Sequence, residues 1–593
     1  MTPAHASPFS PSNADHATGG AAVSPLSRLW RLLAQERPLV IAVYGYAALA
    51  GLFGLTLPLG VQAIVGLVSG GLILQPVVLL VAFVVLGTLA NGALQLQQLH
   101  VVETVQQRVF ARLAFDLTGR LRQVRLDRLG DMDLAESMNR FFEIKTVQKS
   151  LAKLLTDWVA AGLQVVLGLL LLTFYHPYFS LFGVLLLGGL VLVFRLTAPR
   201  GWQTSLGESR YKYRVAHWLE ELARTSRTFR FAGRTALPEQ RMEEEVSAYL
   251  GYRAEHFKVL VRQSVAFVGF KTLITAGLLV LGSLLVVNRQ ITLGQFVASE
   301  IVIVTVLLAV EKLILGLSDV YDILTALEKA GHAASLPTEG EDGISPVGDP
   351  ARPGVAISLH GARFQYEGAT APALHETSLA VGACERVGVT GPRGSGVSTL
   401  LGMVAGILPS YEGVVTLNGV SWRDLEPAGA RGLIGWVGAD PDLFDGSLWD
   451  NLAIGRPQVT AEEVLTLLDH VGLGGWVAAL PDGLRTQVRA GGRALSRGVV
   501  VRLQVVRALV TRPRLLVVDG ALDQLDPSDR GALFPVLFPA RSEWTSLVGS
   551  VQRDVLAATD RIIRLAPGQP AVSGPTRTML AEDSWCQALA VRA

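Results

Sequence analysis

Cysteine and charge are both scarce in this sequence. Of its 593 residues only Cys384 and Cys586 are cysteines, and they lie far apart. This argues against a disulfide framework and against a cysteine-based metal site. Charged residues make up 17% of the chain, whereas soluble domains average about 25%. The formal net charge is +2 and no block of lysine or arginine occurs, so we expect no nucleic-acid partner.

The N-terminal stretch lacks the apolar core of a signal peptide. Residues 1–25 are rich in Ala, Ser, Pro and Gly, which is typical of a disordered leader. Insertion into a membrane would then depend on the first spanning helix itself.

Long uncharged runs dominate the first half of the chain, in which hydrophobic residues are abundant. No Asp, Glu, Lys or Arg occurs between Pro38 and Leu99, nor between Trp158 and Phe194. Each run is long enough for two helices of about 20 residues, and a third apolar pair follows. The sequence therefore predicts a transmembrane domain at 26–336, with six spans at about 39–65, 72–98, 158–175, 178–195, 264–287 and 291–316.

The connections between the predicted spans differ in charge. Three are short turns with almost no charge, whereas the segments 108–153 and 195–262 are long and rich in Arg and Lys. The positive-inside rule places these long segments and both termini in the cytoplasm. We therefore expect a multi-pass protein in contact with lipid in a bacterial-type inner membrane.

Lys271 and Glu300 lie inside the last pair of predicted spans. A charge within a membrane is costly unless it faces a cavity or a partner. These side chains either line a translocation path, or they lie near an interface or pair to hold helices together.

The composition changes after the last span. Residues 337–354 are rich in Pro, Gly, Glu and Asp, which is a linker signature. From 355 to 593, short strand-like runs alternate with helical patterns, which predicts an α/β domain around a mostly parallel sheet. The strand-like runs are 357–365, 385–389, 433–437 and 515–518.

A glycine-rich loop follows the second of these strands. Residues 391–399 read Gly-Pro-Arg-Gly-Ser-Gly-Val-Ser-Thr and lead into a helix. Backbone N–H groups of such a loop cradle phosphate, although the P-loop pattern requires Lys where Val397 stands. The residues expected to contact nucleotide here are Gly391, Gly394, Gly396, Ser398 and Thr399.

Further landmarks follow at fixed spacing. A buried strand ends in Asp519, which with Ser398 would contact Mg²⁺. The segment 495–499 precedes a helix about 20 residues upstream, and 523–526 and 559–563 lie downstream. Order and spacing together make the pattern specific.

With these motifs in this order, the chain resembles an ABC exporter half-transporter over essentially its whole length. Segments 138–143 and 292–296 resemble exporters of the type I secretion and peptide-export kind. The resemblance implies a multi-domain membrane protein, with a six-helix ABC exporter transmembrane domain followed by an α/β P-loop nucleotide-binding domain. It also implies that Tyr366 stands where the family stacks adenine.

The resemblance further implies that catalytic groups have been replaced. The family's P-loop lysine, Q-loop glutamine, catalytic glutamate and switch histidine correspond to Val397, Ala439, Gly520 and Val551. The family signature Leu-Ser-Gly-Gly-Gln reads Leu495, Ser496, Arg497, Gly498 and Val499. Because these groups act as a unit, we expect a degenerate domain that does not hydrolyse ATP alone.

The expected function is that of the non-hydrolysing subunit in a heterodimeric exporter of peptides or proteins. An intact half-transporter would hold ATP and Mg²⁺ opposite Ser496 and Gly498, with a periplasmic adaptor as a further partner. The rival is a non-transporting membrane scaffold or regulator. The missing lysine and glutamate argue against an active homodimer.

The retained polar groups have two interpretations. Tyr366, Ser398 and Asp519 either bind ATP and Mg²⁺ weakly or serve the fold. In the second case the tyrosine packs at a sheet edge, the serine caps its helix, and the aspartate bonds to the P-loop backbone.

Overall fold

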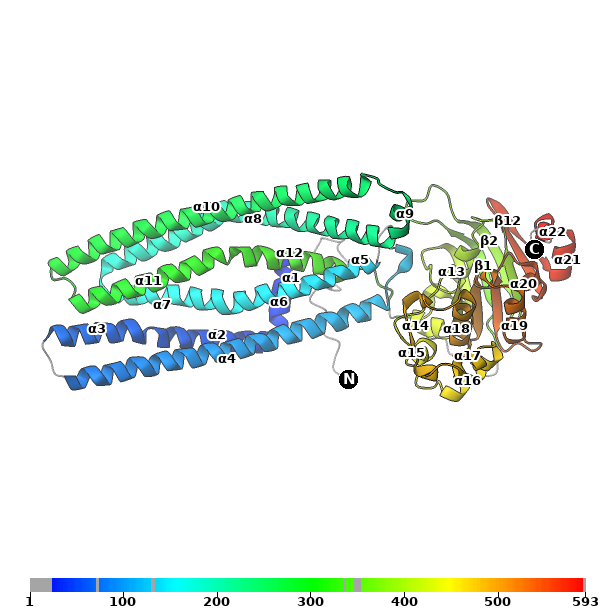
Figure 1. Ribbon diagram of the computed structural model, residues 1–593, viewed down its shortest axis with the longest axis horizontal. Helices are drawn as coiled ribbons and strands as arrows, with labels where there is room; N and C mark the ends of the chain where they lie inside the picture. Colours follow the sequence, from blue (N-terminus) through cyan, green and yellow to red (C-terminus); the bar gives the residue numbers. More distant parts are fainter. Residues whose placement is uncertain are drawn as a thin grey trace. The chain divides into compact units, whose positions relative to one another are not determined.

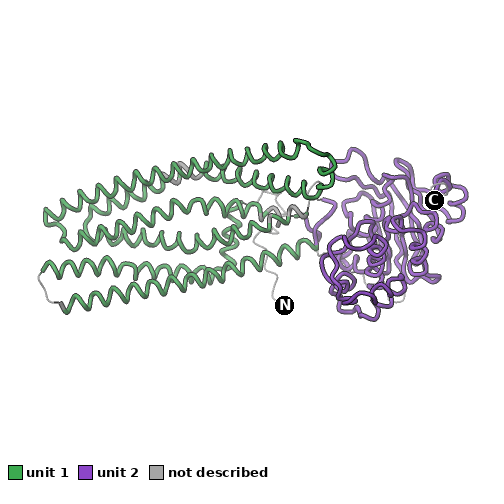
Figure 2. The backbone as a smooth tube through the Cα atoms, viewed as in Figure 1, with its two compact units in different colours: residues 1–122, 133–336 green, residues 123–132, 337–593 purple. Residues whose placement is uncertain are grey.

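The structure is a computed structural model that describes residues 24–70, 74–128, 134–334, 336–340, 342–345 and 353–589. The chain divides into two compact units (Figure 2), of which unit 1 comprises 1–122 and 133–336, and unit 2 comprises 123–132 and 337–593. The predicted leader lies outside the described residues except for Ser24 and Pro25, as do parts of the predicted linker.

Unit 1 is a bundle of long helices (Figure 1). Its helices are α1 (Pro25–Gln35), α2 (Arg37–Gly54), α3 (Thr56–Ser69), α4 (Leu74–Leu121), α5 (Leu134–Asn139), α6 (Glu143–Lys153), α7 (Val159–Tyr175), α8 (Pro177–Arg224), α9 (Ser226–Phe231), α10 (Leu237–Val287), α11 (Leu293–Leu315) and α12 (Leu317–Ala334). A π-helical turn, η3 (Leu154–Trp158), joins α6 to α7, and η2 (Arg140–Phe142) precedes α6.

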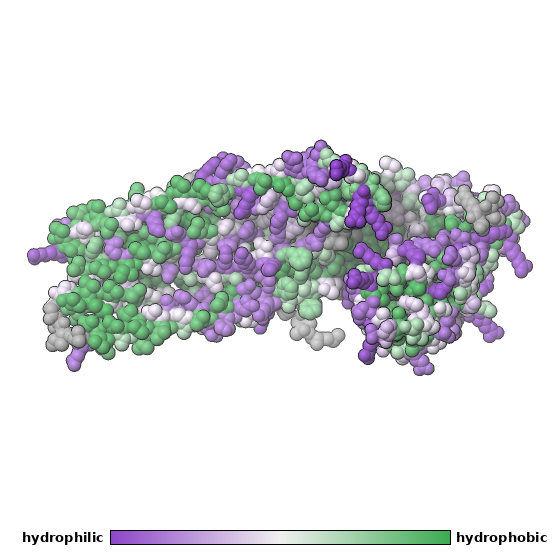
Figure 3. Space-filling view, viewed as in Figure 1, coloured by the Kyte–Doolittle hydropathy of each residue, from purple (hydrophilic) through white to green (hydrophobic). Residues whose placement is uncertain are grey.

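Several of these helices have the length and composition of membrane spans. Among the described residues, five helical runs qualify: Arg37–Ser69, Gln75–Leu121, Glu143–Tyr175, Leu237–Val287 and Leu293–Lys329. A shorter apolar stretch, Pro177–Leu192, lies in α8 where the fourth span is predicted. On the visible face, hydrophobic residues gather over α3, the start of α4, the end of α10 and the start of α11 (Figure 3). The predicted count of six spans remains a prediction.

Small residues allow the helices of unit 1 to pack closely. A Cβ atom added at Gly168 of α7 would lie 2.4 Å from the Val306 side chain of α11, and one at Gly189 of α8 would lie 2.8 Å from the Phe270 ring of α10. Such close approach at small residues is the usual basis of helix association in membranes, where lipid is as apolar as the helices. The buried core around these contacts includes Leu172, Leu278 and Leu307.

Unit 2 is an α/β structure with two main sheets. The six-stranded sheet has the order β12-β11-β3-β10-β9-β6, and all its neighbours are parallel except β12. The four-stranded antiparallel sheet has the order β2-β1-β4-β5, and β7 pairs with β8. The strands are β1 (Ile357–Phe364), β2 (Leu374–Val381), β3 (Arg386–Thr390), β4 (Glu412–Leu417), β5 (Val420–Ser421), β6 (Ile434–Gly438), β7 (Gly446–Ser447), β8 (Gln487–Val488), β9 (Leu515–Asp519), β10 (Thr545–Gly549), β11 (Arg561–Ala566) and β12 (Gln569–Pro575).

Helices cover the six-stranded sheet because its central strands are apolar on both faces. All side chains of β9 up to Val518 are buried, and all of β10 is buried. The helices of unit 2 are α13 (Val397–Val404), α14 (Pro427–Gly432), α15 (Leu448–Ala453), α16 (Ala461–His470), α17 (Gly474–Ala478), α18 (Arg497–Leu509), α19 (Pro527–Leu537), α20 (Arg553–Ala557), α21 (Thr576–Glu582) and α22 (Ser584–Ala588). The predicted mostly parallel α/β sheet is confirmed, whereas the separate antiparallel sheet was not predicted.

Candidate functional site

A cavity of about 340 Å³ lies at the carboxyl ends of β3, β9 and β10. The loop from Gly391 to Gly396 forms one wall, and residues after β9 and β10 form the other. Ligands of open parallel sheets bind at this edge, where the strands end and helices begin. The lining residues that the sequence singled out are Gly391, Gly394, Gly396, Val397, Ser398, Thr399, Asp519, Gly520 and Val551.

Glycines give the loop its shape. A Cβ atom at Gly391 would lie 2.3 Å from the Leu565 carbonyl oxygen, and one at Gly396 would lie 2.5 Å from that of Ala373. Gly396 also has φ +89° and is the N-cap of α13. Because backbone atoms approach so closely at these positions, the loop tolerates no side chain there.

Ser398 and Asp519 join the loop to the end of β9. The Ser398 hydroxyl donates to Asp519 Oδ1 at 2.9 Å. Burial raises the pKa of Asp519 above its ordinary value, and the hydrogen bond from Ser398 opposes that rise. Since Gly396 is the N-cap of α13, the interpretation that Ser398 caps this helix is wrong. The hydroxyl and the carboxylate are oxygen ligands of the kind Mg²⁺ prefers.

Tyr366 lies just beyond β1 and is 44% exposed. Its hydroxyl is 3.3 Å from Thr399 Oγ1, and its ring meets Phe364 edge-on with centroids 4.9 Å apart. The contact with Thr399 places Tyr366 beside the P-loop helix, where the residue stays partly exposed.

The four positions at which the family's catalytic groups are replaced lie together. Val397, Gly520 and Val551 line the cavity, and a Cβ atom on Gly520 would lie 3.8 Å from that of Ala439. The Val551 amide donates to Asp523 Oδ2 at 3.1 Å.

Arg497 of the signature segment bonds within unit 2. Its guanidinium donates to the Ala439 carbonyl at 2.6 Å and to the Gln524 side chain. Gln524 itself donates to the same carbonyl at 2.8 Å, and Gln504 donates to the Asp440 carbonyl at 2.7 Å. The loop after β6 is therefore held from α18 and from the turn after β9.

The other signature residues have local roles in starting α18. Ser496 is the N-cap, and its hydroxyl accepts from the Val499 amide. Leu495 packs against the core on that side of the sheet. A Cβ atom at Gly498 would lie 2.8 Å from an Asp529 carboxylate oxygen, so glycine fits closely there.

Two charged residues of the cavity, Asp523 and Arg393, received no role in the sequence analysis. Asp523 accepts hydrogen bonds from Ser550 and from the Val551 amide, and burial raises its pKa despite them. Arg393 also lines the cavity, and its side chain is exposed. The signal for Asp523 was its place four residues after Asp519; Arg393 was visible as a cation within the glycine-rich loop.

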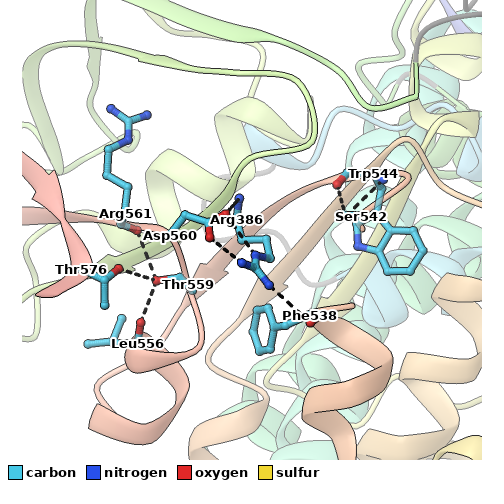
Figure 4. A network of polar contacts seen from close by, with 9 residues as sticks. All are labelled: Arg386, Phe538, Ser542, Trp544, Leu556, Thr559, Asp560, Arg561 and Thr576. Atoms are coloured by element: carbon cyan, nitrogen blue, oxygen red, sulfur yellow. Dashed lines mark hydrogen bonds and ion pairs between the residues drawn. The ribbon is translucent and has the colours of Figure 1, made fainter. Parts of the chain in front are cut away.

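A polar network fixes the start of β3, the strand that leads into the P-loop. Arg386 donates to Asp560 through Nε at 3.0 Å and through a terminal nitrogen at 2.5 Å. The Asp560 amide returns a bond to the Arg386 carbonyl at 2.8 Å. In Figure 4 the Arg386 guanidinium turns toward Asp560 and Phe538, while Thr559 lies among Leu556, Arg561 and Thr576.

Lys271 and Glu300 lie on different helices of unit 1 and make different contacts. Lys271 of α10 pairs with Glu311 of α11 at 3.2 Å. Glu300 of α11 has a buried Oε1 atom that makes no hydrogen bond with a described residue. The structure thus brings Lys271 to Glu311, and the proposed role of either residue in a path remains a prediction.

Comparison with known proteins matches both units. Residues 374–523 match the family model described as ABC transporter. The chain is 34% identical over 228 residues to a multidrug efflux ATP-binding/permease protein of Mycobacterium tuberculosis, covering 38% of this chain and 19% of that protein. It is 28% identical to the cyclolysin secretion/processing ATP-binding protein of Bordetella pertussis, covering 52% of this chain and 43% of that protein. The chain thus spans less than half the length of these relatives.

The fold is shared with a solved structure along nearly the whole chain. A bacterial Atm1-family ABC exporter, solved with ATP bound, superposes with a TM-score of 0.79 at 19% identity, covering 94% of this chain and 98% of that one. The predicted fold class, a helical transmembrane domain followed by an α/β nucleotide-binding domain, is confirmed.

The prediction that this chain is not an ATPase is wrong. Both relatives are ATP-binding transport proteins, and the ABC transporter match extends over the P-loop, Ala439, the signature and Gly520. The prediction counted the side chains replaced at motif positions. It gave the retained Ser398 and Asp519 at most weak nucleotide binding, and it assigned no role to Arg393 in the same cavity.

The bundle of long apolar helices and the P-loop cavity occur in the same order as in these transporters. The chain has the fold of an ABC exporter half-transporter, and its residues 374–523 match the ABC transporter family.

Proposed function

We propose that this chain is one half of an ATP-driven membrane exporter. Unit 2 binds ATP, and unit 1 forms the path for cargo together with the same unit of a second half-transporter. The observation that carries the proposal is the P-loop cavity, where a glycine-built loop lies beside the hydrogen-bonded Ser398 and Asp519. Long apolar helices in the same chain give ATP binding a membrane domain on which to act.

The residues of the cavity fit a nucleotide with its magnesium ion. The loop 391–396 leaves room for phosphate where Cβ atoms are excluded, and the amides at the start of α13 favour an anion. Ser398 and Asp519 would hold Mg²⁺, and the exposed Tyr366 ring would stack on adenine. When bound, ATP supplies the free energy of phosphate transfer to water.

The charge of the connections supports a cytoplasmic unit 2. The segments 108–153 and 195–262 carry the Arg and Lys residues, whereas the turns at 70–73, 176–177 and 288–290 carry one such residue, Arg289. By the positive-inside rule the long segments, both termini and unit 2 lie in the cytoplasm.

The proposed partner is a different half-transporter with the family's P-loop lysine and catalytic glutamate. In the family, ATP sites form between the P-loop of one subunit and the signature of the other. Ser496 and Gly498 of this chain would face the partner's P-loop, while Arg497 is engaged by the Ala439 carbonyl of its own unit. The two ATP sites of such a heterodimer would differ. The replaced residues at 397 and 520 are the reason to favour a heterodimer over a homodimer.

The proposed cargo is a peptide or protein, passed on to a periplasmic adaptor. The support is the likeness of segments 138–143 and 292–296 to type I secretion exporters, together with the cyclolysin secretion relative.

Pairing and nucleotide binding test the proposal together. The chain would be expressed together with the genes that neighbour its own, purified in lipid, and labelled with a photoreactive ATP analogue. We expect a second half-transporter to co-purify and this chain to take up label, and Asp519→Asn but not the exposed control Asp482→Asn to reduce that label. A chain that purifies without a second half and takes up no label would favour the membrane scaffold instead.

A further inference from the structure

We infer that Arg393 supplies the positive charge for the terminal phosphates of ATP that the P-loop lysine supplies in other P-loop proteins. This inference rests on the proposed function, because it assumes that ATP occupies the P-loop cavity. It assigns a binding role to a residue outside the position where the P-loop pattern places its cation.

The charge balance of the cavity motivates the inference. The P-loop position that normally carries lysine is Val397, whose side chain packs toward Gly549 instead of carrying charge. Among the described residues that line the cavity, Asp519 and Asp523 are acidic and Arg393 is the basic one. A nucleoside triphosphate bound beside two carboxylates needs a positive charge in addition to Mg²⁺. Arg393 is the side chain on the cavity wall that carries a positive charge.

The loop geometry presents Arg393 at its tip. The Ser395 amide donates to the Pro392 carbonyl at 3.0 Å, which closes a turn from Pro392 to Ser395. Gly394 has φ +81°, as the third position of a type II turn requires, so Arg393 occupies the second position, at the corner. Arg393 is exposed, and its side chain makes no hydrogen bond or ion pair with a described residue. The guanidinium is therefore not committed to another partner in unit 2.

Two buried hydroxyls on the cavity wall could donate to a polar ligand. Thr390 and Ser395 both line the cavity and are 1% and 5% exposed. Their hydroxyl oxygens make no hydrogen bond with a described residue. Buried hydroxyls are rarely left unsatisfied in folded proteins. Phosphate oxygens, or water ordered by them, would satisfy these groups on the same wall that carries Arg393.

The preference of arginine for phosphate makes this substitution chemically reasonable. A guanidinium donates two parallel hydrogen bonds to phosphate, whereas lysine acts as a point charge. Because Arg393 projects from the corner of the loop and not from the helix that follows it, the inference assigns it to the terminal phosphates.

The experiment compares the affinity of the full-length chain, in detergent with Mg²⁺, for ATP and for AMP. We expect Arg393→Ala to weaken ATP binding about tenfold to a hundredfold, as for loss of a charged hydrogen bond, and to leave AMP binding unchanged. Arg541→Ala is the matched control, since Arg541 is exposed and precedes β10 at the opposite edge of the sheet. Adding Val397→Lys to Arg393→Ala should restore ATP affinity by returning a cation to the cavity.

The outcomes separate the inference from the proposed function. If the unaltered chain binds ATP and Arg393→Ala binds it equally well, the inference is overturned and the proposed function stands. If the unaltered chain binds no ATP, both are overturned. An equal loss of ATP and AMP binding would also overturn it, because that pattern indicates a damaged fold, which the melting temperature of the variant would report.

Discussion

Single side chains outside the P-loop cavity help to set its shape. Arg386 lies at the start of β3, four residues before the strand ends at the P-loop, and its contacts with Asp560 tie β3 to β11. The P-loop begins where β3 ends. By holding β3 against β11, this pair therefore helps to position the P-loop. Both side chains are partly exposed, at 26% and 45%, which limits what the pair contributes.

Replacing Asp560 by Asn should lower the stability of the chain by about 1 kcal/mol, since partly exposed ion pairs contribute little. The hydrogen bonds from Arg386 hold the pKa of Asp560 below its ordinary value. A carboxylate whose pKa is lowered on folding stabilises the folded chain at any pH above its pKa in the unfolded chain, which is about 4. This stabilisation is lost as the pH falls through the lower pKa of the folded chain. Melting temperatures of the two proteins should therefore differ at pH 7 and converge below about pH 4. A difference that persists in acid would contradict this account.

Arg497→Ala should loosen the loop that follows β6. The substitution removes the bonds to the Ala439 carbonyl and to Gln524, leaving the Gln504 contact in place. A loss of about 1 kcal/mol corresponds to roughly fivefold faster opening. Hydrogen exchange of the peptide covering 439–442 measures this, with the exposed Arg493→Ala as the control. Unchanged exchange would show that the loop is held without Arg497.

At the residue scale the sequence predicted which positions meet, but not what they do. The order of motifs was enough to bring Val397, Asp519, Gly520 and Val551 to one cavity. It was not enough to predict the partners of Arg497, because these depend on a carbonyl 58 residues away in sequence. Of the two interpretations left open for Ser398, the helix cap is wrong, since Gly396 is the N-cap and the Ser398 hydroxyl donates to Asp519.

Among the elements, α13 and the loop before it depend most on backbone geometry. The helix begins at Val397 directly after Gly396, whose positive φ turns the chain from the loop into the helix. No residue with a side chain fits there without moving the Ala373 carbonyl.

Gly396→Ala should therefore reduce both stability and ATP affinity. The cost expected for a strained φ together with a backbone clash is about 1–3 kcal/mol. Gly475→Ala is the control, because Gly475 lies in α17 with open space around its Cα and no positive φ. That control should leave melting temperature unchanged or raise it slightly. Equal effects of the two substitutions on melting temperature and ATP affinity would argue against a special conformation at Gly396.

The strands were easier to predict than the helices of unit 1. Strand runs such as 515–518 are short, apolar and bounded by turn residues, so β9 appears almost where expected. Apolar composition located the membrane segments but not how far each helix extends. Helix α8 continues past the predicted span, through Pro199, to Arg224. The polar residues of this extension are helical although they are not apolar enough to be predicted as a span. The antiparallel sheet formed by β1, β2, β4 and β5 carried no motif that would have placed it.

At the scale of the whole molecule, two units of different chemistry share one chain. Unit 1 is held by close helix contacts with few ion pairs in its apolar part, whereas unit 2 is a layered sheet with a buried apolar centre. The order of the two units was predictable, because hydropathy and the glycine-rich loop are strong signals at the sequence level. The partner and the cargo remain proposals.

Lys271 and Glu311 form an ion pair in the apolar part of unit 1, between α10 and α11. Lys271→Met should lower the melting temperature in lipid, because Glu311 then loses its cation in an apolar setting. The double variant Lys271→Met, Glu311→Gln should recover part of the loss. A double variant less stable than the single one would show that the two charges act independently.

The central claim is that ATP is bound and hydrolysed at the P-loop cavity of unit 2 when this chain is paired with a second half-transporter. The most direct measurement is ATP hydrolysis by the full-length chain purified in lipid together with its co-purifying half-transporter, for the unaltered protein, Asp519→Asn and the exposed control Asp482→Asn. The account predicts hydrolysis that falls about a hundredfold in Asp519→Asn, since removal of one positioned polar group commonly costs that much, and no change in Asp482→Asn. No hydrolysis by the unaltered chain, or hydrolysis that Asp519→Asn leaves intact, would contradict it.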